Sequence, residues 1–355
     1  MDNQGNSSIL KRRRLRIAQL APLYERVPPR LYGGTERMVS FITEELVRRG
    51  HEVTLFASGD SRTCARLVPC CDEALRLSGK PELPASLQVA MLAEVYDKAR
   101  ERFDIIHSHI DYWTLPFSRV TGLPTVFTMH GRLDIEDLHC IYRFPEAALV
   151  SISNSQRLPL PNMNWVDTVY HGLPRDLLKF NPNPGRYLAF SGRIAPEKRP
   201  DLAIEIACRS GGPLKIAAKV DVVDRQYFDA VIKPLIQPPH VEYIGEIDDA
   251  EKSEFLGGAR ALLFLIDWPE PFGLAMVEAL ACGTPVIARP CGSVPEVMRP
   301  GGGSGFVASE LDELVAAVDK IDSIPRDQCR RYFEERFTTE TMIDTNGCTP
   351  GSSSH

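Results

Sequence analysis

The sequence predicts an α/β protein built from two doubly wound domains that face a central cleft. Apolar, strand-like runs alternate with helical patterns along most of the chain, which is typical of parallel sheets with helices on both faces. The length of 355 residues suits two domains of ordinary size. A stretch rich in Pro and Asn, residues 173–185, separates the two halves and predicts an interdomain linker.

Each half supplies its own series of expected elements. In the first half, strands are expected near residues 15–21, 52–58, 104–107, 125–129, 148–153 and 168–170, and helices over 35–49 and 86–102. In the second half, strands are expected near 187–192, 214–218, 241–244, 261–265 and 286–288, and helices from Pro200, Arg225, Ala250, Pro271 and Leu311. We therefore expect a disordered basic N-terminus (1–14), an N-terminal domain (15–172), the linker (173–185), a C-terminal domain (186–340) and a disordered tail (341–355).

Composition narrows the class of protein. Lys plus Arg minus Asp plus Glu is 41 − 47 = −6, so the chain has no general attraction to nucleic acid. The basic cluster at 11–16 reads as a solvated segment, with a weak peripheral membrane contact as the alternative. No run of eighteen apolar residues is present, so we expect no membrane-spanning helix, and the first residues lack the apolar core expected of a secretory signal. The nine cysteines are scattered, which disfavours a zinc site or disulfide framework and indicates the cytoplasm.

The segment 268–288, WPEPFGLAMVEALACGTPVIA, carries the strongest functional signal. Pro271 followed by good helix formers predicts a helix from about residue 271, whose first N–H groups, near Phe272 to Leu274, form an anion site. Gly273 leaves room for close approach of a ligand. Glu270 and Glu278 would lie near the two ends of that ligand, roughly 10 Å apart along the axis. The alternative is a solvated helix face, but the flanking apolar strands indicate a buried strand–helix–strand unit.

Three further motifs follow expected strands. Gly33-Gly34 precedes a helix and either closes on an anion or makes a tight turn with Thr35 as N-cap. Arg193 and Lys198 lie in a loop that either grips a diphosphate or is a solvated basic loop. His130, which is followed by a glycine, is either a cleft residue or a core histidine. His109 is a weaker cleft candidate, His107 is expected to be structural, and no spacing completes a metal motif.

With these residues assembled, the chain resembles the family 4 retaining glycosyltransferases from about residue 16 to 337. The resemblance rests on YGGTER (32–37), RRGHEVTLFASGDS (48–61), TMHG (128–131), SGRIAPEK (191–198), EPFGLAMVE (270–278) and ACGTPVIA (281–288). It implies the GT-B fold, in which two Rossmann-like domains flank a cleft, the C-terminal one binds the nucleotide-sugar donor and the N-terminal one lies on the acceptor side.

The resemblance also implies a role for each site residue. Glu270 would contact donor-sugar hydroxyls and Glu278 the ribose, while the backbone at Phe272, Gly273 and Leu274 would meet the sugar and diphosphate. Arg193 and Lys198 would neutralise the departing diphosphate in place of a metal, so no metal or other cofactor is expected. His130 would line the reaction centre. The remaining donor-binding residues would be Gly33 and Gly34, which close over the phosphate, Glu246, in the region that receives the base, and Lys219.

The resulting hypothesis is a retaining, metal-independent hexosyltransferase. By family frequency UDP-glucose is the first expected donor and GDP-mannose the second, and the acceptor is not readable. The alternatives are a nucleotide-sugar epimerase on a similar fold and a catalytically impaired nucleotide-sugar-binding protein. The latter is suggested by the chain's end, TNGCTPGSSSH, where family members continue with a helix that crosses back onto the N-terminal domain.

Overall fold

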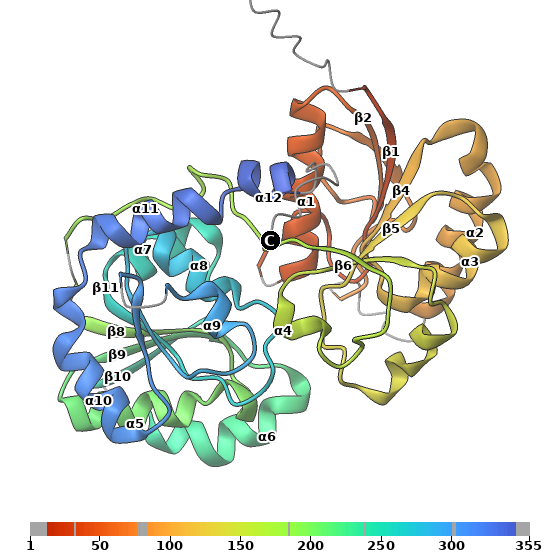
Figure 1. Cartoon of the computed structure of the whole chain (residues 1–355). Helices are drawn as coiled ribbons and strands as arrows, with labels where there is room; N and C mark the ends of the chain where they lie inside the picture. Colours follow the sequence, from red (N-terminus) through yellow and green to blue (C-terminus); the bar gives the residue numbers. More distant parts are fainter. Residues whose placement is uncertain are drawn as a thin grey trace, which may run out of the picture.

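A computed structural model describes residues 13–31, 33–76, 78, 84–183, 185–237, 239–299 and 303–345. Figure 1 shows two lobes, each a parallel sheet with helices on both faces. Of the basic N-terminal segment, Arg13 and Arg14 are described and are exposed, and the rest lies outside the described residues. Within the described ranges, no helix has the length and apolar character needed to cross a bilayer.

The first lobe contains a seven-stranded parallel sheet in the order β3-β2-β1-β4-β5-β6-β7. Its strands are β1 (Arg16–Leu20), β2 (Glu52–Ala57), β3 (Arg66–Pro69), β4 (Ile105–Ser108), β5 (Thr125–Thr128), β6 (Ala148–Ser151) and β7 (Trp165–Thr168). Its helices are α1 (Gly34–Arg48), α2 (Pro84–Arg102), α3 (Leu115–Thr121) and α4 (Asn154–Arg157).

The second lobe contains a six-stranded parallel sheet in the order β10-β9-β8-β11-β12-β13. Its strands are β8 (Tyr187–Arg193), β9 (Leu214–Lys219), β10 (Val241–Gly245), β11 (Ala259–Phe264), β12 (Val286–Ala288) and β13 (Gly305–Val307). Its helices are α5 (Pro200–Ser210), α6 (Arg225–Tyr227), α7 (Asp249–Gly257), α8 (Leu274–Ala281), α9 (Val294–Val297), α10 (Leu311–Lys320) and α11 (Arg326–Arg336), and α12 (Thr339–Thr345) follows.

Both sheets reverse their strand order at one point, and these points face the cleft. In the first sheet the reversal lies between β1 and β4, and in the second between β8 and β11. Ligands of open α/β sheets bind beyond the carboxyl ends of the strands at such a reversal. The fold therefore places the residues after β4 and β5, including His109 and His130, opposite those after β8 and β11, including Lys198 and Glu270.

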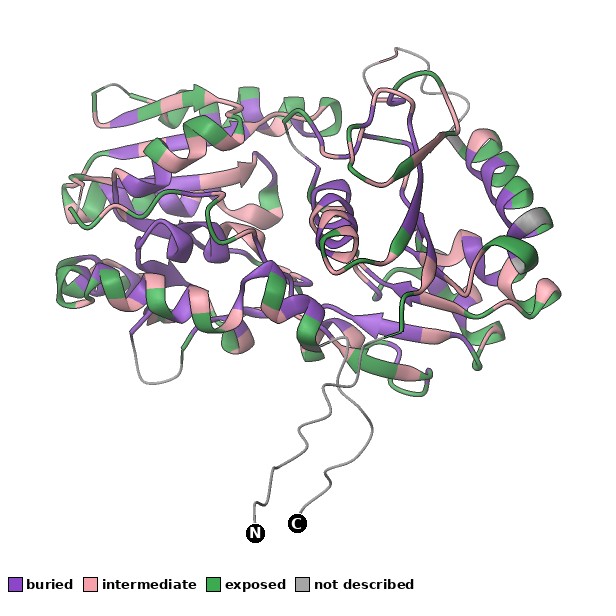
Figure 2. Cartoon of the chain, turned by 90° about the horizontal axis from the view of Figure 1, so that it is seen from above, coloured by how far each residue is buried: buried purple, intermediate pink, exposed green. Residues whose placement is uncertain are grey.

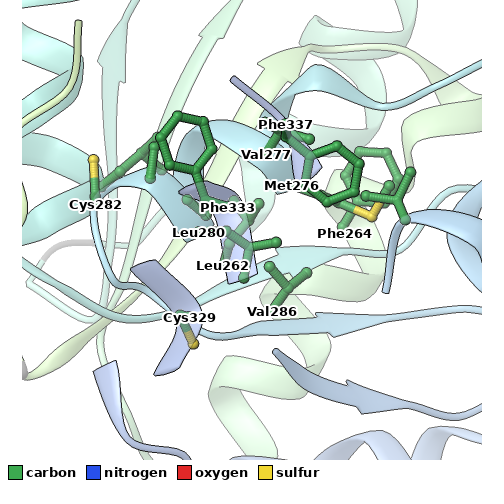
Figure 3. Packing of buried hydrophobic residues seen from close by; sticks show 14 of the residues in the cluster. Leu262, Phe264, Met276, Val277, Leu280, Cys282, Val286, Cys329, Phe333 and Phe337 are labelled. Atoms are coloured by element: carbon green, nitrogen blue, oxygen red, sulfur yellow. The ribbon is translucent and has the colours of Figure 1, made fainter. Parts of the chain in front are cut away.

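Apolar packing holds each sheet to its helices and continues across the interface between the lobes. The buried residues of Figure 2 concentrate on the strands and on the helix faces that meet them. In Figure 3, Phe333 and Phe337 pack beside Val277 and Leu280 of α8. The same cluster includes Met38 of α1 and Ile152, so the two lobes share part of one core. Burial of apolar surface stabilises the folded state by about 25 cal/mol per Å².

The end of the chain returns to the first lobe, contrary to the expectation of a disordered tail from residue 341. Residues 341–345 complete α12, which lies beside α1 (Figure 1). Met342 is buried there, and Arg49 Nη1 donates to Asp344 Oδ1 at 2.7 Å. A helix that contacts the first lobe is therefore present at Thr339–Thr345, and residues 346–355 lie outside the described residues.

Several predicted boundaries were wrong. The helix expected from Pro271 begins at Leu274, because Gly273 adopts φ 82°, a left-handed conformation that precedes the helix. The strand expected at 168–170 is β7, which ends at Thr168. Strands β3 and β13 were not predicted. Strand β13 begins with a glycine and spans only three residues, so it lacks the continuous apolar run that marked the equally short β12.

We predict that Gly172→Ala destabilises the return of the chain to the first lobe. A Cβ at Gly172 would lie 2.2 Å from the carbonyl oxygen of Thr338, at the point where Leu173 and Thr338 form a β-bridge. Because the neighbour is backbone, the strain should lower the free energy of unfolding by about 1–3 kcal/mol. Gly131→Ala is the control, since a Cβ there meets nothing within 4 Å. Equal stability of the two variants in chemical denaturation would refute this account.

Candidate active site

A cavity of about 460 Å³ lies between the two lobes, a size typical of small-molecule sites. Its lining comes from both domains and includes the strand ends at both reversals of strand order. Twelve of the residues proposed from the sequence line it: Gly33, Gly34, His130, Arg193, Lys198, Lys219, Glu246, Glu270, Phe272, Gly273, Leu274 and Glu278. The weaker cleft candidate, His109, is buried and does not line the cavity.

The N-termini of two helices open onto this cavity from opposite lobes. Helix α1 begins at Gly34 and α8 begins at Leu274, and a Cβ at Gly34 would lie 3.8 Å from Leu274 Cδ1. The first N–H groups of a helix lack partners within the helix and carry partial positive charge. Thr35 is not the N-cap of α1, a position that Gly33 occupies. The two helix ends together favour an anionic ligand between them.

The loop before α8 is held by hydrogen bonds from Ser293, which follows β12. Ser293 N donates to the carbonyl oxygen of Glu270 at 3.0 Å, and Ser293 Oγ donates to that of Phe272 at 2.7 Å. A Cβ at Gly273 would lie 2.7 Å from Met276 Cε and 2.8 Å from Phe264 Cζ. A glycine is therefore required at position 273 because the backbone has a left-handed φ and because neighbouring side chains leave no room for a Cβ atom. The sequence had suggested a different reason, the close approach of a ligand.

Lys198, expected at the diphosphate, and Glu270, expected at the donor sugar, form an ion pair with each other. Their side chains are 17% and 13% exposed, so the pair is partly shielded from water. The Lys198 ammonium also lies 4.6 Å from the ring centroid of Trp268. From the other lobe, the Arg132 guanidinium lies 5.1 Å from the same ring. Lys198 therefore has a carboxylate partner that an anionic ligand would have to replace.

Arg193 is also bound by carboxylates. Its guanidinium pairs with Glu197 and with Asp224, and its Nε lies 3.9 Å from Asp221 Oδ2. Asp221 in turn pairs with Lys219 at 3.0 Å. Arg193 is therefore held by carboxylates rather than being a freely solvated side chain, and a diphosphate bound to it would have to displace them.

Glu278 joins the two lobes through a buried ion cluster. Its Oε1 accepts hydrogen bonds from Arg37 of α1 at 3.0 Å and from Lys252 of α7 at 2.7 Å. Asp249 lies 2.9 Å from the same Arg37 nitrogen. Burial opposes ionisation of Glu278, but the attraction of Lys252 and Arg37 outweighs it and lowers the pKa of the carboxyl. Glu278 is therefore anionic and occupied by partners from both domains.

Four histidines gather at the carboxyl ends of the first sheet. The rings of His107 and His109 lie 4.1 Å apart, those of His109 and His130 5.1 Å, and those of His130 and His171 5.2 Å. Burial lowers the pKa of His107 to about 4 and that of His171 to about 3, and it also lowers the pKa of His109 and of His130 well below the ordinary 6.5. All four rings are therefore neutral at pH 7.

Comparison with known proteins identifies the family. Residues 179–337 match the model of glycosyl transferases group 1, and residues 32–169 match that of glycosyltransferase family 4. The chain belongs to these glycosyltransferases. It is 25% identical to the D-inositol 3-phosphate glycosyltransferase of Mycolicibacterium smegmatis, over 76% of this chain and 74% of that protein.

Solved structures agree on the fold of this glycosyltransferase. Sucrose-phosphate synthase from Thermosynechococcus elongatus superposes with a TM-score of 0.76 at 16% identity, over 93% of this chain and 97% of that one. Anabaena HepE in complex with UDP and glucose superposes with a TM-score of 0.72 at 17% identity, over 94% of this chain and 98% of that one. The GT-B fold expected from the resemblance is confirmed.

Several cavity residues of this glycosyltransferase were not predicted from the sequence. Arg37 ends the quoted YGGTER motif, yet its reach to Glu278 depends on how the lobes meet. Lys252 belongs to α7, and the spacing of residues in the sequence does not show where α7 lies relative to α8. Glu36 lines the cavity as a buried carboxyl group, and burial raises its pKa to about 7. Burial of a charged residue at the first turn of an amphipathic helix has no sequence signature.

We predict that His107→Gln removes a pH-dependent part of the stability. The pKa of His107 falls from an ordinary 6.5 to about 4 on folding, so below pH 6.5 protons bind the unfolded chain preferentially. Between pH 7.5 and pH 5 this histidine should cost the wild type about 2 kcal/mol of unfolding free energy. The variant should therefore be less destabilised, relative to wild type, at pH 5 than at pH 7.5. A pH-independent difference in denaturant titrations would contradict the assignment.

Proposed function

We propose that this chain is a retaining, metal-independent hexosyltransferase that moves a hexose from a nucleotide-diphosphate sugar to an acceptor. UDP-glucose is the first donor to test and GDP-mannose the second. The observation that carries the proposal is a single cavity in which two helix N-termini meet Arg193, Lys198 and Lys219, next to the carboxylates Glu270 and Glu278. The similarity to HepE, whose structure is a complex with UDP and glucose, supports the first donor. The scattered cysteines make the cytoplasm the expected compartment.

Donor binding would proceed by exchange of ionic partners. Without a ligand, Lys198 is neutralised by Glu270, which keeps both charges satisfied in a partly dry site. A diphosphate placed at the start of α8 would take over Lys198 in a charge-assisted contact. Glu270 would then be released to accept hydrogen bonds from sugar hydroxyls. The same pair thus links recognition of the diphosphate to recognition of the sugar.

The remaining residues would hold the rest of the donor. The first amides of α8, near Leu274, and the Gly33-Gly34 end of α1 would face the diphosphate from the two lobes. Glu278, kept anionic by Arg37 and Lys252, would accept from the ribose hydroxyls. Glu246 and Lys219, which line the cavity beyond β10 and β9, would lie toward the base.

The reaction would break the bond between the anomeric carbon and the diphosphate oxygen and form one to the acceptor oxygen on the same face. Positive charge develops on the sugar and negative charge on the diphosphate, and fixed cations aimed at the latter lower the barrier. The acceptor's hydroxyl proton would pass to the departing diphosphate oxygen. The transferred sugar develops positive charge during the reaction. His130 is neutral, so it would add no second positive charge beside the sugar.

The proposal is tested by ligand binding and by the product formed. A ligand that binds the folded state at 100 times its Kd stabilises it by about 2.7 kcal/mol, which thermal unfolding with UDP- and GDP-sugars would detect. Incubation with the stabilising sugar nucleotide alone should give slow hydrolysis that EDTA leaves unchanged. Formation of an epimer would indicate the epimerase, loss of turnover in EDTA would refute metal independence, and binding without any turnover would indicate a silent binding protein.

We predict that Lys198→Ala and Glu270→Ala each lower the turnover of the donor by one to three orders of magnitude, the range for removal of a transition-state contact. Lys215→Ala and Glu242→Ala are matched controls, because these residues form a solvent-exposed pair on strands of the same sheet. The controls should keep wild-type rates. Near-wild-type turnover in both site variants would refute the assignment of this pair.

A further inference from the structure

A network of buried and partly buried hydrogen bonds runs from Thr128 through His107, Gln19 and His109 to His130. His107 Nε2 lies 2.8 Å from Thr128 Oγ1, and His107 Nδ1 lies 3.3 Å from Gln19 Nε2. Gln19 Oε1 lies 2.7 Å from His109 Nε2, and His109 Nδ1 lies 2.8 Å from His130 Nε2. Gln19 is fully buried in the middle of the first sheet, on β1.

The amide of Gln19 sets the direction of this chain. Its carbonyl oxygen can only accept, so His109 must donate from Nε2, which leaves Nδ1 of the neutral ring as an acceptor. His130 must then donate from Nε2 to His109 and keep a lone pair on Nδ1. On the other side the Gln19 amide group donates to His107 Nδ1, so His107 donates to Thr128. One orientation of one side chain thus fixes three imidazole tautomers.

The series of hydrogen bonds ends at His130, whose second ring nitrogen still lacks a hydrogen-bond donor within the described part of the chain. His130 Nδ1 is buried and, among the described residues, has no hydrogen-bond partner. A buried acceptor without a partner costs about 1–3 kcal/mol. His130 lines the cavity, and its ring is held between His109 and His171, the latter packed edge-on against Phe272. A hydroxyl group is the complementary ligand, because it can donate to this lone pair without charge.

We propose that Gln19 and His109 are positioning residues, which hold His130 in the tautomer protonated on Nε2 so that its Nδ1 accepts a hydrogen bond from a hydroxyl of the transferred sugar. The role of the sugar rests on the proposed function. The tautomer itself does not, because it is a property of the ligand-free protein, and the two claims fail independently.

The first test is 15N–1H NMR of the histidine rings in the ligand-free protein, whose long-range couplings distinguish the two neutral tautomers. His130 and His109 should both be protonated on Nε2. In Gln19→Met the acceptor for His109 is lost, and His130 should become a mixture of tautomers. In Gln19→Glu, burial without a cationic partner favours the neutral carboxyl group, whose carbonyl oxygen can accept from His109 and whose O–H can donate to His107, so all three rings should keep their wild-type tautomers.

The controls make this result specific. Ser151→Ala removes a partly buried hydrogen bond to Thr168 on the same sheet, outside the chain of histidines, and should leave every ring signal unchanged. His130 protonated on Nδ1 in the wild type, or a His130 signal unaffected by Gln19→Met, would overturn the positioning role.

The second test measures the hydrolysis of UDP-glucose and of GDP-mannose. Gln19→Met should lower the rate about tenfold for the sugar nucleotide that is the substrate, equivalent to one hydrogen bond, and Gln19→Glu should restore it. Ser151→Ala should match the wild type. An unchanged rate in Gln19→Met with the expected NMR result would refute the contact with the sugar and leave the tautomer assignment intact, and turnover of neither substrate would count against the proposed function.

Discussion

The site depends on charge compensation within the cleft. Lys198 is neutralised by Glu270, Arg193 by Glu197 and Asp224, and Arg37 with Lys252 by Glu278. Cations gathered at two helix N-termini would repel one another if left unpaired in a water-poor site, and breaking one buried pair costs about 3–5 kcal/mol. The carboxylates make this concentration of positive charge compatible with a stable fold, and they define what a diphosphate must displace.

The doubly wound topology explains why these groups meet. Each sheet reverses its strand order once, and the loops that follow the strands at the reversal face the other lobe. The lobes are held in that orientation by the apolar cluster that includes Met38 and Phe272, by the Arg37–Glu278 contact, and by α12, which returns the chain to α1. Glu296 of α9 adds a polar contact, because its carboxylate accepts from the backbone N–H groups of Asn154 and Ser155 at the start of α4. Orientation of the lobes and assembly of the site are therefore set by the same contacts.

The fold could be predicted from local patterns, because apolar periodicity marked most strands. Loops after parallel strands converge at one edge of a sheet, so Lys198 and Glu270 could be grouped without coordinates. The placing of His130, Glu246 and Lys219 at the same site came from the resemblance to the glycosyltransferase family. The sequence did not show which side chains of the cavity contact one another. Whether Lys198 meets a ligand or Glu270, whether Glu278 is free or held by Arg37, and how Gln19 orders the histidines all depend on distances between side chains far apart in the chain. The beginning of α8 was misplaced because Pro271 matched a helix start, whereas the left-handed conformation of Gly273 delays it.

A structure of the protein with a bound nucleotide sugar tests the exchange of partners most directly. We expect the diphosphate to lie at the start of α8 within hydrogen-bond distance of Lys198, and the Glu270 carboxylate to have left Lys198 for hydroxyls of the sugar. A complex in which Lys198 remains paired with Glu270, with the diphosphate bound away from both helix N-termini, would contradict this exchange.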